Sequence, residues 1–295
     1  MINIKARILK IINGGMTAIS ENNIIECEPN GKVKKSKFYV GDFVELEENK
    51  YGSKYIVTSV LDRINNLVRP PIANLDQLFI LISKVPKTDY LLIDKLIIYC
   101  AVNNIVPFLV INKKDLYTEQ ELESIRQEYA GVVADIIIVS AKEKIGIEYL
   151  KECLKGKVSA FSGQSAVGKS TLINAIDSDL KLSTNGLSKK ISRGKHTTRH
   201  SEIFVINDDI LIADTPGFSM LDLQLDIDYK ELSRYYSDFA MYLECKYSNC
   251  DHTNLKDKDC CVARAVLDNK ININRYNRYV ELYKIMKEKW RKKYD

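Results

Sequence analysis

Nine consecutive residues near the middle of the chain have the types and spacing of a phosphate-binding loop. They fit the pattern G-x-x-x-x-G-K-[ST] and lie between an apolar stretch, 158–162, and a helical stretch that begins at about residue 169. In such a loop the backbone N–H groups and the helix N-terminus stabilise phosphate, Lys169 reaches the terminal phosphates, and the Ser170 hydroxyl ligates Mg²⁺. The loop consists of Gly163, Gln164, Ser165, Ala166, Val167, Gly168, Lys169, Ser170 and Thr171.

A second motif, Asp214-Thr215-Pro216-Gly217, follows the apolar stretch 210–213. As the end of a strand in the same sheet, it places the Asp214 carboxylate at the carboxyl edge beside the phosphate loop. We expect Asp214 to hold Mg²⁺ through a water molecule and the Gly217 N–H to contact a γ-phosphate.

Two further motifs follow the predicted strands 107–111 and 136–140, and their residue types suit a guanine base. Asp115 offers acceptors to the N1–H and the exocyclic amine of guanine, which adenine does not present in that arrangement, so ATP should be rejected. Backbone N–H groups around Ala141 are expected to contact the guanine oxygen. Either motif alone is weak evidence for a guanine site, but together with the phosphate loop the two motifs are specific. They are Asn112-Lys113-Lys114-Asp115 and Ser140-Ala141-Lys142.

These four motifs make up a GTPase site, but their order in the chain is unusual. Familiar GTPases place the phosphate loop first and the base-reading motifs last, whereas here residues 112–115 and 140–142 precede Gly163. The sequence therefore predicts a circularly permuted GTPase domain of α/β class, with a mostly parallel sheet covered by helices on both faces.

A cluster of cysteines near the C-terminal end has the composition of a metal site. Three thiolates and one imidazole complete a closed tetrahedral Zn²⁺ site with no open position for catalysis. Buried or redox-active thiols are the alternative to a metal. Bound Zn²⁺ would supply folding energy to a segment too short to form a core of its own. The candidate ligands are Cys245, Cys250, His252 and Cys260, or Cys261 in place of Cys260.

The elements that position these motifs fall into three groups. The pattern of residues 1–68 predicts short strands separated by turns, at a spacing typical of a small β-barrel. Arg69-Pro70-Pro71 ends that pattern and is the expected linker. Apolar strands then alternate with helices, and beyond residue 223 only helical patterning remains. We expect domains at 1–68, 69–226 and 227–295. The expected strands are 6–12, 16–19, 24–27, 43–46, 55–61, 78–83, 107–111, 136–140, 158–162, 202–206 and 210–213, and the expected helices are 90–102, 118–129, 147–154 and one from about 169.

Composition excludes several classes of protein. The 295 residues are 45% apolar and 28% charged, as in ordinary folded proteins. No apolar stretch approaches the ~20 residues of a membrane span, and the first residues lack the features of a signal peptide, so we expect a cytoplasmic protein with no membrane partner. Seven cysteines, an odd number, do not indicate a disulfide framework.

The net charge of +5 is concentrated in two places. Residues 179–200 hold six Lys/Arg against one acidic residue, and residues 275–295 hold eight against three. Such patches attract polyanions, although a solvated helix face is the simpler interpretation on composition alone. Within the second patch an apolar stripe at helical spacing is more typical of packing than of stacking on RNA. The stripe is Tyr279, Tyr283, Met286 and Trp290.

Taken together, these features resemble the ribosome small-subunit-dependent GTPase A family over nearly the whole chain. The likeness includes the permuted order, the barrel, the Cys/His cluster, Asn74-Leu75-Asp76-Gln77 and Gly194-Lys195-His196-Thr197-Thr198. It implies an OB-like, RNA-binding barrel, a zinc-binding helical C-terminal domain, and a GTP hydrolase that acts as a monomer. It further implies that the protein binds the small ribosomal subunit and its rRNA late in assembly, with subunit-stimulated hydrolysis of GTP to GDP driving release.

The resemblance also assigns roles to single residues. It places Gly194-Lys195-His196-Thr197-Thr198 in the first switch, where Thr198, favoured over Thr197, closes over Mg²⁺. Phe218 follows Asp214–Gly217 and cannot orient the attacking water, so the family pattern gives that role to His196. The catalytic residues that the resemblance implies are therefore His196, Lys169 and Thr198. An RNA-facing role for His196 is an equal alternative.

For zinc, the family pattern favours Cys260 over Cys261, because Cys261-Val262 fits the residues that follow the family's last ligand. The gap after His252 is two residues longer than the family typically has. A nucleotide-gated RNA-binding module with negligible turnover is the alternative function, and a zinc-thiol redox sensor is a third.

Overall fold

The structure is a computed structural model that describes residues 4–12, 15–31, 33, 36–49, 52, 54–68, 70–177, 201–207, 209–214, 225 and 227–294. Two of the gaps, 178–200 and 215–224, contain residues to which the sequence assigns switch roles: His196, Thr197, Thr198 and Gly217 lie outside the described residues.

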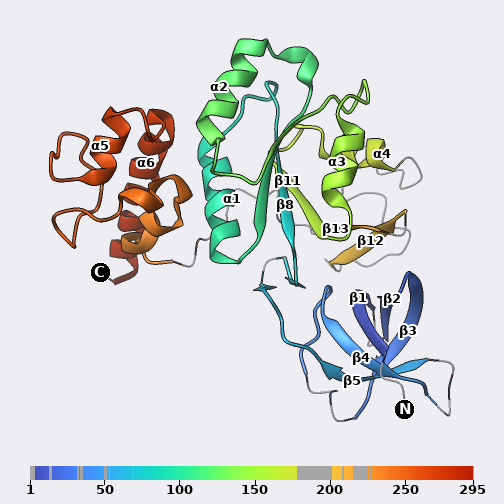
Figure 1. The fold of residues 1–295 in the computed structure, drawn as a ribbon. Coiled ribbons are helices and arrows are strands. Elements are labelled where there is room, and N and C mark those ends of the chain that lie inside the picture. Colours follow the sequence, from blue (N-terminus) through green and yellow to red (C-terminus); the bar gives the residue numbers. More distant parts are fainter. Residues whose placement is uncertain are drawn as a thin grey trace.

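The N-terminal region is a closed five-stranded barrel. Its strands run β1-β2-β3-β5-β4 and close because β4 also pairs with β1; the β3–β5 pair is parallel and the others are antiparallel. Alternate side chains such as Ile8, Ala18 and Val44 fill the interior, as the period of two requires. The barrel forms one end of the molecule (Figure 1). Its strands are β1 (Ile4–Ile12), β2 (Gly15–Ser20), β3 (Asn23–Pro29), β4 (Phe43–Glu47) and β5 (Tyr55–Val60).

A six-stranded sheet forms the centre of the molecule. Its strands lie in the order β10-β9-β8-β11-β13-β12, and all neighbours are parallel except β12 and β13. The chain enters in the middle at β8, runs to one edge, and returns beside β8 at β11. The strands are β8 (Gln77–Ile82), β9 (Val106–Ile111), β10 (Ile136–Ile138), β11 (Val158–Gly163), β12 (Glu202–Ile206) and β13 (Ile210–Asp214).

Helices cover both faces of this sheet, and each face has its own core. One core joins alternate strand residues such as Leu78 and Ile80 to α1 and α2, and the other joins Phe79 and Leu81 to α3 and α4. Because side chains on both faces are buried, β8 has no exposed residue, which explains its continuous apolar run. The helices are α1 (Tyr90–Val102), α2 (Glu119–Tyr129), α3 (Ile147–Leu154) and α4 (Lys169–Ile176), with a 3₁₀ turn η1 (Lys114–Leu116).

The barrel joins the central sheet through strand pairing, ion pairs and apolar packing, since Leu9 of β1 lies in the same core as Leu78. Strand β1 pairs with the edge strand β12, where Lys10 lies opposite Glu202 and their side chains form an ion pair at 2.7 Å. Arg7 approaches Asp76 to 3.7 Å just before β8. A short hairpin of β6 (Asn66–Leu67) and β7 (Ile72–Ala73) spans the Pro-Pro segment that leads into the sheet.

The C-terminal region is helical, and the structure describes no strand in it among residues 227–294. Its core includes Ile98 of α1, so the region packs directly against that helix. The prediction that the apolar stripe serves packing is confirmed for Tyr279 and Tyr283, which are buried, whereas Trp290 meets the Tyr229 ring edge-on at 5.8 Å but is 42% exposed. The elements are η2 (Tyr229–Tyr235), η3 (Ser237–Tyr242), α5 (Cys261–Leu267) and α6 (Ile273–Tyr294).

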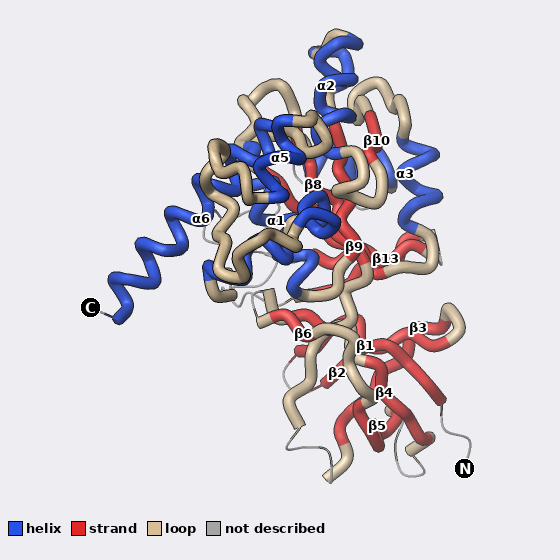
Figure 2. The backbone as a smooth tube through the Cα atoms, turned by 60° about the vertical axis from the view of Figure 1, so that its left-hand side comes forward, coloured by secondary structure: helices blue, strands red, loops and turns tan. Residues whose placement is uncertain are grey.

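The interpretation of 275–295 as one basic patch is wrong at its beginning. Arg275 and Arg278 are turned inward, with only 2% and 13% of their side chains exposed, and both pair with Asp94. Figure 2 shows the C-terminal end of α6 projecting from the body of the molecule. Exposed basic side chains in the second half of α6 are Lys284, Lys289, Arg291 and Lys292. Among the described residues no helix is long and apolar enough to cross a bilayer.

Candidate functional site

The phosphate loop connects β11 to α4 and requires glycine at both ends. Gly163 has a φ of +141°, and a Cβ there would lie 2.4 Å from the Leu81 carbonyl oxygen. Gly168 has a φ of +97°, and a Cβ there would lie 2.4 Å from the side-chain nitrogen of Asn112. These close approaches bring the loop against neighbouring strands, which explains the glycine positions of the motif. Gly168 is the N-cap of α4, so the N-terminus of that helix points into the loop.

Lys169 is the first residue of α4, and its ammonium lies inside the loop. It donates hydrogen bonds to the carbonyl oxygens of Gly163 at 2.6 Å and Gln164 at 3.0 Å. Burial lowers the pKa of Lys169 to about 8. A buried, poorly solvated ammonium at this position is a strong binding partner for an anionic phosphate group.

The predicted base-reading residues meet at the carboxyl ends of β9 and β10. The Asn112 side chain donates to the Val167 carbonyl at 2.9 Å and accepts from the Ala141 N–H at 3.2 Å, so it joins both motifs to the phosphate loop. The Ser140 hydroxyl donates to Asp115 Oδ1 at 3.4 Å, which leaves the other carboxylate oxygen of Asp115 open to a ligand.

These residues line one cavity of about 160 Å³. It lies between the base-reading edge and the start of α4, and the predicted residues dominate its lining. Lys113 crosses beside it: its ammonium donates to the carbonyls of Val85 and Ala166. The backbone N–H of Lys114 is used for a bond to Val139. The lining residues are Asn112, Lys113, Asp115, Ser140, Ala141, Lys142, Gly168 and Thr171.

Asp214 is the last residue of β13, which pairs with β11 and therefore ends beside the phosphate loop. Burial, together with the facing carboxylate of Glu202, raises the pKa of Asp214 to about 6. A partly buried carboxylate that faces another carboxylate gains stability from a nearby divalent cation, as the predicted magnesium role requires. Ser170 lies in the first turn of α4 at the same edge of the sheet.

The cysteine cluster forms a compact four-residue group between η3 and α5. The ligand atoms of Cys245, Cys250, His252 and Cys260 all lie within 4.8 Å of one another. Tetrahedral Zn²⁺ with bonds of about 2.1–2.3 Å sets ligand atoms about 3.6–3.8 Å apart. The pairs made by Cys245, His252 and Cys260 measure 3.5, 3.6 and 4.0 Å. Burial lowers the pKa of His252, which favours the neutral imidazole that binds metal.

Cys261 lies outside this group. Its thiol donates to the Glu244 carbonyl at 3.0 Å and accepts from the Arg264 guanidinium at 3.1 Å. Its backbone N–H instead donates to Cys245 Sγ at 3.1 Å, and the N–H of Ala263 donates to Cys260 Sγ at 3.4 Å. N–H donors of this kind stabilise metal-bound thiolates, so the geometry favours Cys260 over Cys261 as the fourth ligand.

Sequence reasoning missed a buried ionic network that joins the central sheet to the C-terminal region. Asp94 on α1 accepts from Arg275 at 2.7 Å and from Arg278 at 2.6 Å, and Arg278 also pairs with Glu128 of α2. The available signal is a single Asp-Lys pair within the otherwise apolar helix 90–102, where an acidic residue on a buried face requires a cationic partner.

A parallel sheet with a phosphate loop after β11 and base-binding residues after the earlier strands β9 and β10 defines a circularly permuted P-loop GTPase. The profile of the family called RsgA GTPase matches residues 60–224. Two relatives carry the name Small ribosomal subunit biogenesis GTPase RsgA. The protein from Ruminiclostridium cellulolyticum is 38% identical, over 95% of this chain and 93% of its own length. The protein from Caldanaerobacter subterraneus is 39% identical, over 100% of this chain and 99% of its own length.

Solved structures agree with this class. The crystal structure of YjeQ from Thermotoga maritima matches with a TM-score of 0.83 at 33% identity, over 97% of this chain and 99% of that one. The crystal structure of YloQ, described as a circularly permuted GTPase, matches with a TM-score of 0.80 at 29% identity, over 98% of this chain and 96% of that one. The chain belongs to the RsgA GTPase family. The predicted fold class and GTPase activity are thereby confirmed.

Proposed function

We propose that this protein binds GTP between the phosphate loop and the base-reading edge, and that it hydrolyses GTP during maturation of the small ribosomal subunit. The observation that carries the proposal is the Asn112–Val167 hydrogen bond with the cavity beside it, because it joins motifs 55 positions apart in the chain into one pocket. The names of the relatives support the ribosomal role.

Guanine specificity rests on Asp115. Its free carboxylate oxygen and the one shared with Ser140 face the cavity as acceptors for the N1–H and the exocyclic amine of guanine. The Ala141 N–H and its neighbours serve the guanine oxygen. Adenine has an acceptor at N1 and a donor amine at position 6, so it would place an acceptor against Asp115 and a donor against the Ala141 N–H. Such mismatched polar groups are strongly unfavourable when they are buried.

Phosphate binding and hydrolysis use the loop and the two switches. The loop N–H groups and Lys169 hold the phosphates, while Ser170 and, through water, Asp214 hold Mg²⁺, which neutralises charge developing on the phosphates. The Gly217 N–H contacts the γ-phosphate. By family likeness, Thr198 closes over Mg²⁺ and His196 orients the attacking water. Thr198→Ala and His196→Ala test the two side-chain roles directly through the rate of GTP hydrolysis.

Zinc is the metal that best fits the Cys/His group. Three thiolates and one imidazole at tetrahedral spacing are a structural set, with no ligand position left for substrate. Bound there, Zn²⁺ would hold the segment before α5 against the C-terminal core. The ligands we assign are Cys245, Cys250, His252 and Cys260.

The flanking regions are the proposed RNA-binding parts. The barrel has the OB strand order, and the second half of α6 presents exposed lysines and arginines to a polyanion. We assign the barrel to residues 1–68, the GTPase domain to 69–226 and the zinc domain to 227–295. The protein would act as a monomer in the cytoplasm, with the flanking domains holding rRNA and hydrolysis of GTP to GDP timing release.

Multiple-turnover phosphate release, measured with and without purified small subunits, tests the function. We expect slow turnover alone and strong stimulation by subunits. Unchanged slow turnover would instead favour a nucleotide-gated RNA-binding module. Asp115→Asn tests the base contact separately, because asparagine presents a donor to the position 2 carbonyl of xanthine: the variant should lose GTP binding and gain xanthosine triphosphate binding.

A further inference from the structure

Gln164, the second residue of the phosphate loop, holds the segment that precedes α1. Its side-chain oxygen accepts from the backbone N–H of Asp89 at 2.9 Å, and its amide donates to the Lys87 carbonyl at 3.3 Å. Asp89 is the N-cap of α1, where its carboxylate accepts from the Leu92 N–H. The phosphate loop is therefore bonded directly to the start of α1.

A second contact reaches the same segment from the base-reading motif. The Lys113 ammonium donates to the Val85 carbonyl at 2.6 Å and to the Ala166 carbonyl at 2.9 Å. Within the segment, Thr88 donates to the Ser83 carbonyl at 3.0 Å. Residues 83–89 are thus fixed both internally and to two sides of the nucleotide cavity.

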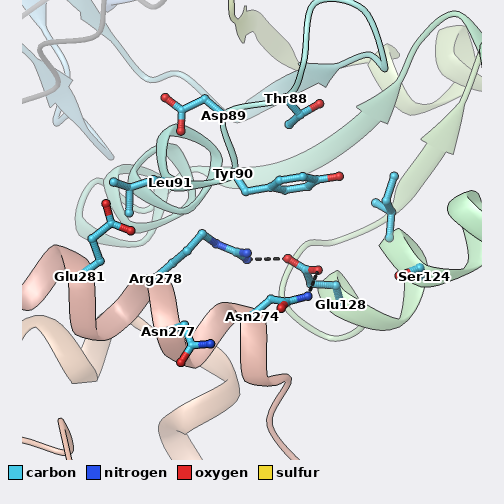
Figure 3. A pocket seen from close by; sticks show the side chains of 11 residues that line it. Thr88, Asp89, Tyr90, Leu91, Ser124, Glu128, Asn274, Asn277, Arg278 and Glu281 are labelled. Atoms are coloured by element: carbon cyan, nitrogen blue, oxygen red, sulfur yellow. Dashed lines mark hydrogen bonds and ion pairs between the residues drawn. The ribbon is translucent and has the colours of Figure 1, made fainter.

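The other side of α1 is attached to α6 by directed ion pairs. Figure 3 shows Arg278 reaching from α6 beneath the Tyr90 ring toward Glu128 of α2, with Asn274 on the same carboxylate. Arg278 also bonds to Asp94, one turn further along α1. The C-terminal region therefore contacts the helix whose first turn is held by the phosphate loop.

A polar groove of about 800 Å³ lies over this contact, so water reaches it from one side. In Figure 3 the groove is bordered by the start of α1, by α2 and by α6. On this side α6 is held by hydrogen bonds and ion pairs, which are sensitive to direction, next to apolar packing of Leu91 and Ile98 of α1 on the C-terminal core. A small displacement of the first turn of α1 would thus act on Arg278.

We propose that residues 83–89 and α1 transmit the nucleotide state of the phosphate loop to α6, with Gln164 and Arg278 as the positioning residues at the two ends. This inference rests on the proposed binding of GTP at the loop. Lys169 donates to the Gln164 carbonyl, and nucleotide phosphates, as charged acceptors, compete for the same ammonium. Nucleotide binding therefore changes the contacts of the residue that holds α1.

Hydrogen exchange on the full-length protein tests the proposal. Peptides covering 273–282 are followed without nucleotide, with saturating GDP and with a saturating non-hydrolysable GTP analogue. We expect their exchange rates to differ between these states in the unaltered protein, and the difference to be lost in Gln164→Ala at confirmed saturation. The matched control is Lys87→Ala, which keeps the carbonyl that Gln164 contacts and should respond like the unaltered protein.

Arg278→Lys tests the same path from its far end. Lysine keeps the charge but lacks the planar fork that reaches Asp94 and Glu128 together. Because coupling is reciprocal, this variant should change the ratio of GDP to GTP-analogue affinities although it does not line the nucleotide cavity. An unchanged ratio, or a normal exchange response in Gln164→Ala, overturns the inference while nucleotide binding itself stands. Absence of nucleotide binding overturns the proposed function as well.

Discussion

Replacement of Asp94 measures what holds the C-terminal region to the central sheet. The Asp94 side chain is fully buried and accepts from two guanidinium groups, those of Arg275 at 2.7 Å and Arg278 at 2.6 Å. In Asp94→Ala both guanidinium groups stay buried, but one of the anions between them is gone.

The expected size of the effect follows from the remaining partners. Removal of one member of a buried ion pair costs about 3–5 kcal/mol, because the other charge is left uncompensated. Here Arg275 keeps Asp238 and Arg278 keeps Glu128. One carboxylate charge is therefore lost among three, and we expect a destabilisation near the lower limit, about 3 kcal/mol. The neighbouring control, Lys95→Ala on the same helix, should stay within about 0.5 kcal/mol.

The chain's single tryptophan, Trp290, provides the assay because it lies on α6 beside Tyr229. Its fluorescence during urea unfolding reports the C-terminal region even where the whole chain does not unfold in one step. With a urea dependence of about 1–3 kcal/mol per M, the Asp94→Ala midpoint should fall by about 1–3 M. A shift no larger than that of Lys95→Ala would refute the reasoning, since it would mean that desolvation cancels the attraction within the network.

Three further results are expected. Gly168→Ala, with φ of +97° and a Cβ 2.4 Å from the neighbouring asparagine amide, should weaken GTP binding at least tenfold by isothermal calorimetry, whereas Gly156→Ala, at φ +66° in open space, should leave binding unchanged. GTP affinity should fall as pH rises above about 8, because Lys169 then binds phosphate only after taking up a proton. Lys169→Arg should remove this pH dependence of the affinity. An equal pH dependence in both proteins would contradict the assignment of the titrating group to Lys169. Cys260→Ala should lose zinc by elemental analysis and increase exchange in 245–267, while Cys261→Ala keeps its zinc; the reverse result would make Cys261 the ligand.

Local patterns predicted the strands and helices well because burial and period coincide in this chain. The apolar runs that became β8 and β11 are buried on both faces, and the Thr118 capping box marks the start of α2 within one residue of its prediction. The two glycines of the phosphate loop likewise lie where the backbone requires them. The pocket was predictable for the same reason: each of its motifs directly follows a strand.

Long-range charge pairing could not be predicted in this way. Arg275 and Asp94 are 181 positions apart, and a local count of charge assigned Arg275 to a basic surface. Only the packing of α6 on α1 shows that this arginine neutralises a buried acid. The contact of Gln164 with the start of α1 is similar, since its partners are backbone groups that have no sequence signature.

Permutation changes what the nucleotide site is connected to, although it leaves the site intact. The pocket depends on which strand ends are neighbours in space, and the order β9-β8-β11-β13 supplies those neighbours whatever the order along the chain. Among the described residues β13 is the last strand along the chain, and η2 of the C-terminal region is the next element that the structure describes. That region also packs on α1, whose first turn is bonded to Gln164. The C-terminal region is thus linked to both sides of the phosphate site, once through the chain and once through packing.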